Sequence, residues 1–150
     1  MTLKLNFFAK SDRGLIRDNN EDSGYAGPHL LILADGMGGH AAGEVASELM
    51  VNHLEILDQD PGQEDTAALL EAAAEQANEA ISDHVKAHPE TEGMGTTLTT
   101  MLFNGTDFGV CHVGDSRGYL LRDGKLKQVT KDDTYVPVSY THLRAHETRH

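Results

Sequence analysis

The stretch HLLILADGMGGHAAGE, residues 29–44, decides the fold because it joins two elements of different type through an acidic, glycine-rich turn. Residues 29–35 form a short, continuous apolar run, which is typical of a buried central strand. Apolar residues recur with helical spacing further on, so a helix is expected over residues 41–57. Asp35 and Gly36 are therefore expected where a buried strand ends and the chain turns toward a helix.

The other expected elements follow from periodicity and turn signals. A second helix is expected over residues 64–87, because its apolar stripe has helical spacing and Pro89 ends it. Further strands are expected at residues 3–8, 96–103, 109–115, 118–124 and 125–130. Two strands, two helices and four more strands make an α+β order, in which helices cover sheets.

The bulk composition suits one ordinary soluble domain. The chain has 150 residues, of which 39% are hydrophobic and 24% are charged. Its formal net charge of −12 argues against nucleic acid or an anionic membrane as a partner. Cys111 is the single cysteine, and no apolar stretch approaches the length of a signal core or a membrane span. A reducing, cytoplasmic location is expected.

The glycine-rich turn fits two chemistries. Gly36, Gly38 and Ala41 match the G-x-G-x-x-A fingerprint, whose glycines let a dinucleotide pyrophosphate approach a helix N-terminus. Against this interpretation, Asp35 would repel a pyrophosphate, and a second helix follows where a parallel strand is required. A dinucleotide-binding enzyme is kept as a distant alternative.

A divalent metal ion is the second chemistry. Mg²⁺ and Mn²⁺ prefer oxygen ligands, and Asp35 together with the Gly36 carbonyl supplies them at a strand end. Further acidic residues occur as Glu21 and Asp22 in the run RDNNED and as Asp115 in the run VGDSRG. Each run alone reads equally well as an ordinary polar turn.

Four motifs in order carry a resemblance to a known family. They are GLIRDNNEDS, LLILADGMGGHAAGEVAS, GMGTTLTTMLF and VCHVGDSRGYLLRDGKLKQVTKDD, and the similarity covers residues 5–136. Together they resemble the metal-dependent protein phosphatases (type 2C, PPM), in particular the actinobacterial serine/threonine phosphatases that oppose Ser/Thr kinases. The resemblance implies an α/β sandwich of two antiparallel sheets flanked by helices, truncated here at its C-terminal side.

The resemblance also implies roles for individual residues. Asp35 would bridge two Mn²⁺ or Mg²⁺ ions, the Gly36 carbonyl would bind one of them, and Glu21 would lie near it through water. Asp115 matches the ligand of a third ion, and Asp22 would support the ligands from behind. Arg17 matches the catalytic, substrate-binding arginine, whose planar fork suits a phosphate monoester.

The implied activity is hydrolysis of phosphoserine and phosphothreonine in proteins, by a binuclear metal centre that activates water. The implied partners are phosphoproteins, including a Ser/Thr kinase. No protein nucleophile is required, so Cys111 is expected to be a strand residue. Met37 stands where eukaryotic relatives have a histidine proposed as general acid, and His40 comes three residues later. Protonation of the leaving group is left unassigned.

The last 14 residues, 137–150, do not fit the strand pattern and are interpreted as a non-native tail, so residues 1–136 are expected to be the N-terminal part of a PPM-type domain. Two aspartate ligands of the family would lie beyond this part, so the 150-residue chain is expected to be inactive. A catalytically inactive PPM-like binding module is the alternative. His84 and His88, four residues apart, are expected on a solvated helix face rather than on zinc.

Overall fold

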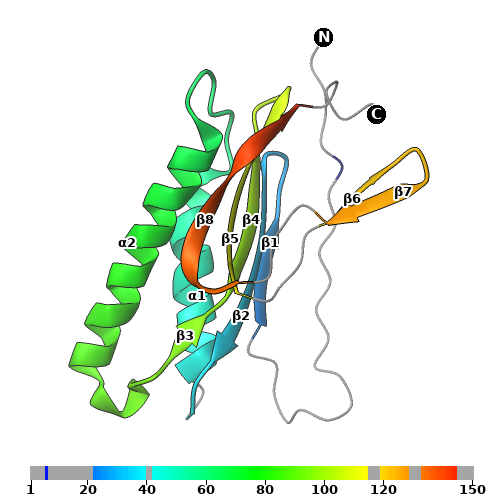
Figure 1. Ribbon diagram of the computed structural model, residues 1–150. Helices are drawn as coiled ribbons and strands as arrows, with labels where there is room; N and C mark the ends of the chain where they lie inside the picture. Colours follow the sequence, from blue (N-terminus) through cyan, green and yellow to red (C-terminus); the bar gives the residue numbers. More distant parts are fainter. Residues whose placement is uncertain (1–5, 7–21, 40–41, 115–118, 129–132, 145–150) are drawn as a thin grey trace.

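The computed structural model describes residue 6 and residues 22–39, 42–114, 119–128 and 133–144. Two helices lie against one face of an antiparallel sheet (Figure 1). In chain order the elements are β1 (Asp22–Ala26), β2 (Leu30–Met37), α1 (Ala42–Leu54), the 3₁₀ turn η1 (Glu55–Leu57), α2 (Thr66–Ala87), the 3₁₀ turn η2 (Pro89–Thr91), β3 (Gly95–Thr96), β4 (Leu98–Phe103), β5 (Asp107–Gly114), β6 (Tyr119–Arg122), β7 (Lys125–Gln128) and β8 (Asp133–Arg144).

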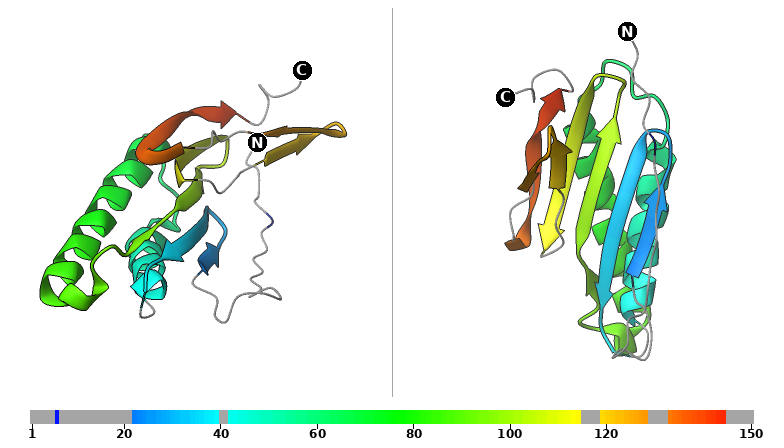
Figure 2. Two further views of the ribbon diagram at one scale, coloured as in Figure 1. Left: turned by 60° about the horizontal axis from the view of Figure 1, so that its bottom comes forward. Right: turned by 90° about the vertical axis from the view of Figure 1, so that its right-hand side faces the viewer.

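The main sheet has the strand order β1-β2-β4-β5-β8, and the short β3 pairs with the end of β2. Strands β6 and β7 form a separate hairpin that extends away from the main sheet (Figures 1 and 2). Every strand pairing among the described residues is antiparallel. The α+β class expected from the sequence is confirmed.

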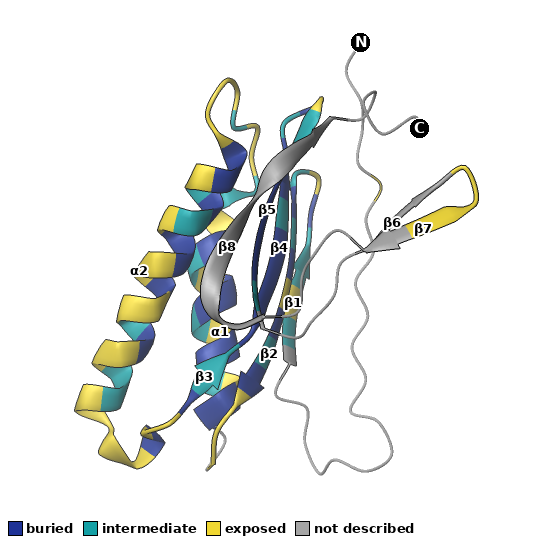
Figure 3. Cartoon of the chain, viewed as in Figure 1, coloured by how far each residue is buried: buried dark blue, intermediate teal, exposed yellow. Residues whose placement is uncertain are grey.

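Strand β2 is an interior strand of the sheet, because β1 and β4 pair with its two edges, and one of its faces packs on the helices. Leu30, Ile32 and Ala34 alternate along the strand and are at most 5% exposed. Leu33 lies on the other face and is 43% exposed. Figure 3 shows the same asymmetry in α2, whose buried residues lie on the side toward the sheet and whose exposed residues lie on the side away from it. The apolar run in the sequence is therefore a strand buried chiefly on one side.

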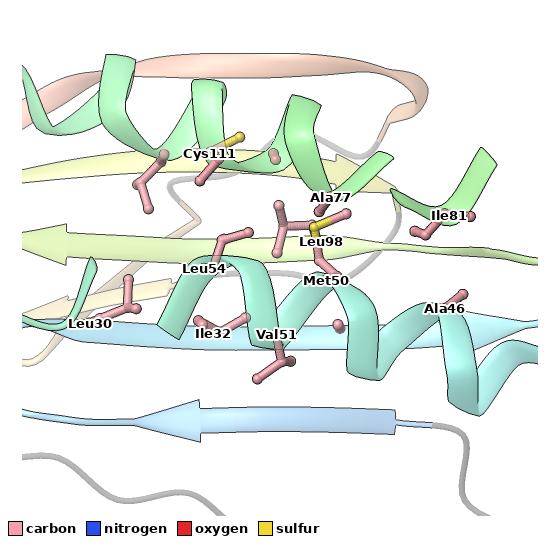
Figure 4. Close-up of a cluster of buried hydrophobic side chains, with 14 of the residues drawn as sticks. Leu30, Ile32, Ala46, Met50, Val51, Leu54, Ala77, Ile81, Leu98 and Cys111 are labelled. Carbon is pink, nitrogen blue, oxygen red and sulfur yellow. The ribbon is translucent and has the colours of Figure 1, made fainter. Parts of the chain in front are cut away.

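The core lies between this sheet face and the two helices (Figure 4). Leu54 of α1 and Leu70 of α2 are fully buried, as are Leu98 and Leu102 of β4. Burial of side chains of this size contributes roughly 2 kcal/mol each, so this layer provides much of the stability of the described part.

Helix α2 begins and ends where its sequence signals indicate. The Asp65 carboxylate accepts a hydrogen bond from the Ala68 N–H at 3.2 Å and caps the first turn. Pro89 opens the 3₁₀ turn η2 directly after the helix. The expected helix over 64–87 is confirmed to within two residues at its start.

The first turn of α2 lies on the backbone of β5 at Gly109. A Cβ atom at this position would lie 2.3 Å from the Thr66 hydroxyl and 2.5 Å from the Ala67 backbone nitrogen. Real Cβ atoms essentially never approach other atoms this closely. Only glycine therefore allows the helix to sit at this depth on the sheet.

The turn between β1 and β2 is held by a carboxylate from the end of the α1 region. Asp58 accepts hydrogen bonds from the Tyr25 hydroxyl and, at 2.9 Å, from the His29 N–H. The hydrogen bond to Asp58 raises the pKa of Tyr25 above its ordinary value. Within the turn, the Gly27 N–H donates to the Leu30 carbonyl at 2.9 Å. Asp58 therefore holds the turn from a segment that lies outside the hairpin of β1 and β2.

Two strands were not expected from the sequence. Residues 22–26 were interpreted as part of a turn-rich segment, but they form β1. Residues 133–144 form β8 on β5, and this strand includes residues 137–144 of the stretch interpreted as a tail. Pro137 is accommodated because β8 is an edge strand and its register shifts between His112 and Gly114. The non-native origin of residues 137–150 stays a prediction, and the strand expected at residues 3–8 lies outside the described residues apart from residue 6.

Candidate metal centre

Asp35 lies near the end of β2, and two hydrogen bonds to Thr97 hold its backbone. Its N–H donates to the Thr97 hydroxyl at 3.0 Å, and its carbonyl accepts the Thr97 N–H at 2.9 Å. Its neighbour Ala34 is fully buried toward the helices. Since successive residues of a strand point to opposite faces, Asp35 is directed to the face away from the helices. The side chain is half-buried there.

A second acidic position lies directly beside it. Asp22, the first residue of β1, is the register partner of Asp35. Positions paired in this way share one face of an antiparallel sheet, with Cβ atoms about 5 Å apart. On the other side of Asp35, Thr97 precedes β4, and Leu98 pairs with Val113 near the end of β5. We call Asp22, Asp35, Thr97 and Gly114 the acidic row, because these positions follow one another across neighbouring strands and begin with two acidic residues.

The glycines after Asp35 set the path into α1. Gly36 is buried and pairs with Thr96 of β3. Gly38 has a φ of +144°, and a Cβ on it would lie 3.2 Å from the Met94 Cα and from the Ala42 Cβ. Both the backbone angle and the close packing favour glycine. The Gly39 carbonyl accepts the Ala42 N–H at 3.0 Å and starts the helix.

The dinucleotide alternative is wrong for this chain. A dinucleotide-binding unit returns from its first helix to a parallel strand. Here α2 follows α1, and β4 then pairs with β2 in the antiparallel sense. Glu55, at the distance expected for a ribose-binding acid, lies in η1 rather than at a strand end. The glycines serve the turn and not a pyrophosphate.

The structure brings together only part of the predicted site. The positions of Asp22, Asp35 and Gly36 lie side by side, whereas Arg17, Glu21 and Asp115 lie outside the described residues, as does His40. Among the described residues, no group of three or more His, Cys, Asp and Glu side chains is placed to hold a metal ion. The metal site stays a prediction, of which the acidic row is the described part and for which the other predicted ligands come from adjoining segments.

Two threonines of the acidic region were not singled out from the sequence. Thr97 holds the backbone of Asp35, as described above, and Thr99 contacts the ring of His112. The run TTLTT, placed directly after the glycine-rich GMG, is the signal that was available. Thr97 and Thr99 alternate in this run and therefore lie on one sheet face. The sequence alone could not show that this is the face on which Asp35 lies.

Cys111 is a residue of β5 in the core beneath α2, as expected. It is fully buried, and burial raises the pKa of its thiol to about 11, with a smaller contribution from the charge of Glu71. A nucleophilic cysteine requires a lowered pKa, so the environment of Cys111 opposes that role.

The raised pKa of Cys111 predicts a loss of stability in alkali. The folded protein keeps the proton up to about pH 11, whereas the unfolded thiol releases it near its ordinary value of 9.0. The stabilisation is therefore complete below pH 9 and is lost between pH 9 and pH 11. Between pH 8 and pH 10.5 the free energy of unfolding should fall by about 2 kcal/mol more in the parent than in Cys111→Ala. Urea denaturation at both pH values measures this difference, and equal losses would contradict the prediction.

His84 and His88 lie one helical turn apart near the end of α2. Their ring centroids are 4.5 Å apart, and the His88 Nδ1 lies 3.6 Å from a Glu90 carboxylate oxygen. His88 is exposed and His84 is partly exposed, so the pair lies on the solvent-facing side expected from the sequence.

Comparison with known proteins identifies the family. The family described as protein phosphatase 2C matches residues 5–142. The chain belongs to this family. The match runs six residues beyond position 136, where the resemblance in the sequence was expected to end.

Individual members of the protein phosphatase 2C family agree with this assignment. The serine/threonine protein phosphatase PstP of Mycobacterium tuberculosis is 60% identical over 136 residues, which are 91% of this chain and 26% of that protein. The Listeria monocytogenes serine/threonine phosphatase stp is 38% identical over 140 residues, with 85% of this chain and 54% of that protein covered. The chain thus spans about a quarter to a half of the length of these relatives.

The solved structures show the same relationship. The catalytic domain of PstP in complex with two manganese ions superposes with a TM-score of 0.84 at 60% identity, covering 88% of this chain and 57% of that domain. A second PstP structure gives a TM-score of 0.85. The helix-covered antiparallel sheet is therefore that of a protein phosphatase 2C domain. In the described part of the chain, no helix is long and apolar enough to cross a membrane.

Proposed function

We propose that this chain carries the N-terminal part of the catalytic domain of a metal-dependent serine/threonine protein phosphatase. One observation carries the proposal: Asp35 lies near the end of a buried strand, beside its register partner Asp22. The chain has 60% sequence identity to a domain of the same fold that was solved with two manganese ions. A pair of acidic positions on one sheet face, near the end of a strand, suits hard divalent cations.

The proposed metal ligands come from β2 and from the segments before β1 and after β5. Asp35 would bridge two Mn²⁺ or Mg²⁺ ions, with the Gly36 carbonyl and Glu21 on one of them and Asp115 on a third. Asp22, one strand away from Asp35, would orient the ligands through hydrogen bonds. When bound, the ions would supply an activated water and offset the charge of the phosphate.

The chain's own residues would hold the substrate and the ligands in place. The guanidinium of Arg17 would bind two phosphate oxygens of a phosphoserine or phosphothreonine side chain through paired N–H donors. Thr97 fixes the backbone of Asp35 by two hydrogen bonds, so the carboxylate starts from a defined position. Cys111 takes no part, since it lies in the core beneath α2.

The biological setting follows from the relatives and the composition. Two of the relatives are named serine/threonine phosphatases, so phosphoproteins are the proposed substrates, with an opposing Ser/Thr kinase among them. The lone cysteine supports a cytoplasmic location. We also propose that residues 1–136 are the family portion, and that residues 137–150 are not native to it.

The test compares the chain with a completed domain. In the completed domain, residues 1–136 are followed by the part of the M. tuberculosis PstP catalytic domain that lies beyond the matched region. We expect Mn²⁺-dependent hydrolysis of p-nitrophenyl phosphate and of a phosphothreonine peptide by the completed domain, and none above background by the 150-residue chain. Turnover by the 150-residue chain would overturn the expected inactivity of the fragment.

A second readout separates an enzyme from a binding module. Calorimetric titration with Mn²⁺ is run on the completed domain alongside the kinetic assay. If the completed domain bound Mn²⁺ and a phosphopeptide but hydrolysed neither substrate, the inactive binding module would be the better interpretation. If it folded but bound no Mn²⁺, the metal-centre proposal would be wrong.

A further inference from the structure

Met37 is an exposed apolar side chain beside Asp35, and the proposed function gives it no role. It is the last residue of β2 and comes two positions after Asp35. Residues two apart in a strand lie on the same sheet face, about 7 Å from each other, so Met37 shares the face of Asp35. The Met37 side chain is 52% exposed, whereas Met50 and Met94 are buried in the core. Met37 is therefore an open apolar surface next to the candidate metal centre.

The partner strand leaves this side chain uncovered. Met37 pairs in register with Gly95 of β3, which has no side chain to place over it. A Cβ on Gly95 would lie 3.8 Å from the Met37 Cγ and 4.0 Å from its Sδ, which is ordinary contact. Packing therefore does not demand a glycine here, and the Met37 side chain extends toward β3. We call Met37 and Gly95 the apolar rim.

The apolar rim differs in position from the other exposed apolar residue of this face. Leu33 is 43% exposed and precedes Asp35 by two residues, but it lies inside the sheet, with β1 and β4 paired to its two edges. Met37 pairs with β3 alone among the described strands, and the chain then turns at Gly38 toward α1. A molecule that approaches Asp35 from beyond the strand end therefore passes the apolar rim.

We propose that Met37 selects substrates that carry an apolar side chain within two residues of the phosphorylated residue. The phosphate would lie at the metal ions held by Asp35. Alternate side chains of an extended peptide are about 7 Å apart, which matches the separation of Asp35 and Met37 along β2. A flanking apolar side chain would then cover the exposed part of Met37, whose flexible, unbranched side chain adapts to partners of different shape. This inference rests on the proposed function, because it requires a phosphate at the acidic row.

Two substitutions of Met37 separate apolar contact from side-chain size. Met37→Gln keeps the length and makes the end polar, whereas Met37→Leu stays apolar. The completed domain is assayed with phosphothreonine peptides that carry leucine at one position within two residues of the phosphothreonine and alanine at the others. We expect kcat/KM for one leucine peptide to exceed that for the all-alanine peptide by about fivefold, since this contact buries the exposed half of Met37. Met37→Leu should keep this preference, and Met37→Gln should reduce it to less than about twofold.

The matched control is Ile56→Gln. Ile56 lies on η1 and is 71% exposed, so the same kind of exposed apolar surface is lost away from Asp35, and the leucine preference should persist. Equal preferences in the parent and in Met37→Gln would overturn the inference, and so would a parent without preference at any position. A completed domain that hydrolysed none of the peptides would overturn the proposed function, and this inference with it.

Nuclear magnetic resonance gives a readout that needs neither turnover nor a folded variant. The completed domain is labelled with ¹³C at the methionine methyl groups and saturated with Mg²⁺. The preferred leucine peptide, with a non-hydrolysable phosphonate in place of the phosphate, should shift the methyl resonance of Met37. Met50 is the internal control, because it lies on α1 in the core between the helices and the sheet, and its resonance should stay unchanged. A Met37 resonance that does not move while the peptide binds would overturn the inference.

Discussion

Replacing Asp35 by Asn should lower Mn²⁺-dependent phosphatase activity of the completed domain by about 1,000-fold or more, because about 4 kcal/mol of transition-state stabilisation is lost with the bridging charge. The substitution keeps the size of the side chain. The backbone hydrogen bonds of Asp35 to Thr97 do not involve the carboxylate, so the fold should be retained. Steady-state hydrolysis of p-nitrophenyl phosphate measures the effect.

The matched control for Asp35 is Asp83→Asn. Asp83 lies on the exposed side of α2, so the same loss of one negative charge occurs away from the acidic row. Its activity should stay within about twofold of the parent, as expected for an exposed charge. An Asp35→Asn variant as active as the Asp83→Asn control would remove Asp35 from the metal centre.

Replacing Gly109 by Ala should destabilise the chain by about 3 kcal/mol and lower the melting temperature by roughly 10 °C. The added methyl group would lie 2.5 Å from the Ala67 backbone nitrogen, and backbone cannot move aside as a flexible side chain can. Helix α2 would have to lift from β5 near its first turn. Thermal denaturation followed by circular dichroism measures the loss.

Gly24→Ala is the control for this effect. Gly24 is an exposed position of β1, and a Cβ there would meet the Ile32 carbonyl oxygen at 3.5 Å, which is ordinary contact. In a strand, alanine costs less backbone entropy than glycine, so the change should be within about 1 kcal/mol of the parent. Equal stability of the Gly109→Ala and Gly24→Ala variants would show that α2 does not depend on close approach at Gly109.

The elements around the glycine-rich turn could be predicted because local and tertiary preferences agree there. The apolar run of residues 29–35 forms β2 at Leu30–Met37, and the helical period of residues 41–57 forms α1 and η1. Asp65 and Pro89 mark the ends of α2 through hydrogen bonding and a fixed backbone angle, which are local effects. Such signals act over a few residues and can be read from the sequence directly.

Strands β1 and β8 could not be predicted because their pairing is a tertiary effect. The run DSGYA of β1 has little apolar alternation, since Ser23 meets α1 through its Ser47 contact at 3.0 Å and Gly24 faces away from the core. Its neighbour β2 supplies the pairing surface. Strand β8 alternates through TYVPVSYT, but Pro137 and the histidine-rich end outweighed that pattern.

The chemistry of the site could be predicted further than its geometry. Asp35 and Gly36 were identified from a local pattern, and their place at the end of β2 is confirmed. That Asp22 lies beside Asp35 depends on the register of β1 on β2, and the contact between Thr99 and His112 depends on the register of β4 on β5. No spacing within one strand encodes such cross-strand neighbours.

The turn held by Asp58 sets the register that brings Asp22 and Asp35 of the acidic row opposite each other. Four register pairs lie between that turn and the pair of Asp22 and Asp35, and each pair repeats the register set at the turn. Sliding β1 by one residue would bring Ser23 opposite Asp35 and would turn Asp22 toward the helices, with no change at the metal ligands themselves. Evolution is therefore expected to tolerate insertions in this family more readily after η1 than between Ala26 and Leu30. The contacts of Asp58 with the turn therefore help to keep Asp22 and Asp35 side by side, although they lie at the other end of the hairpin.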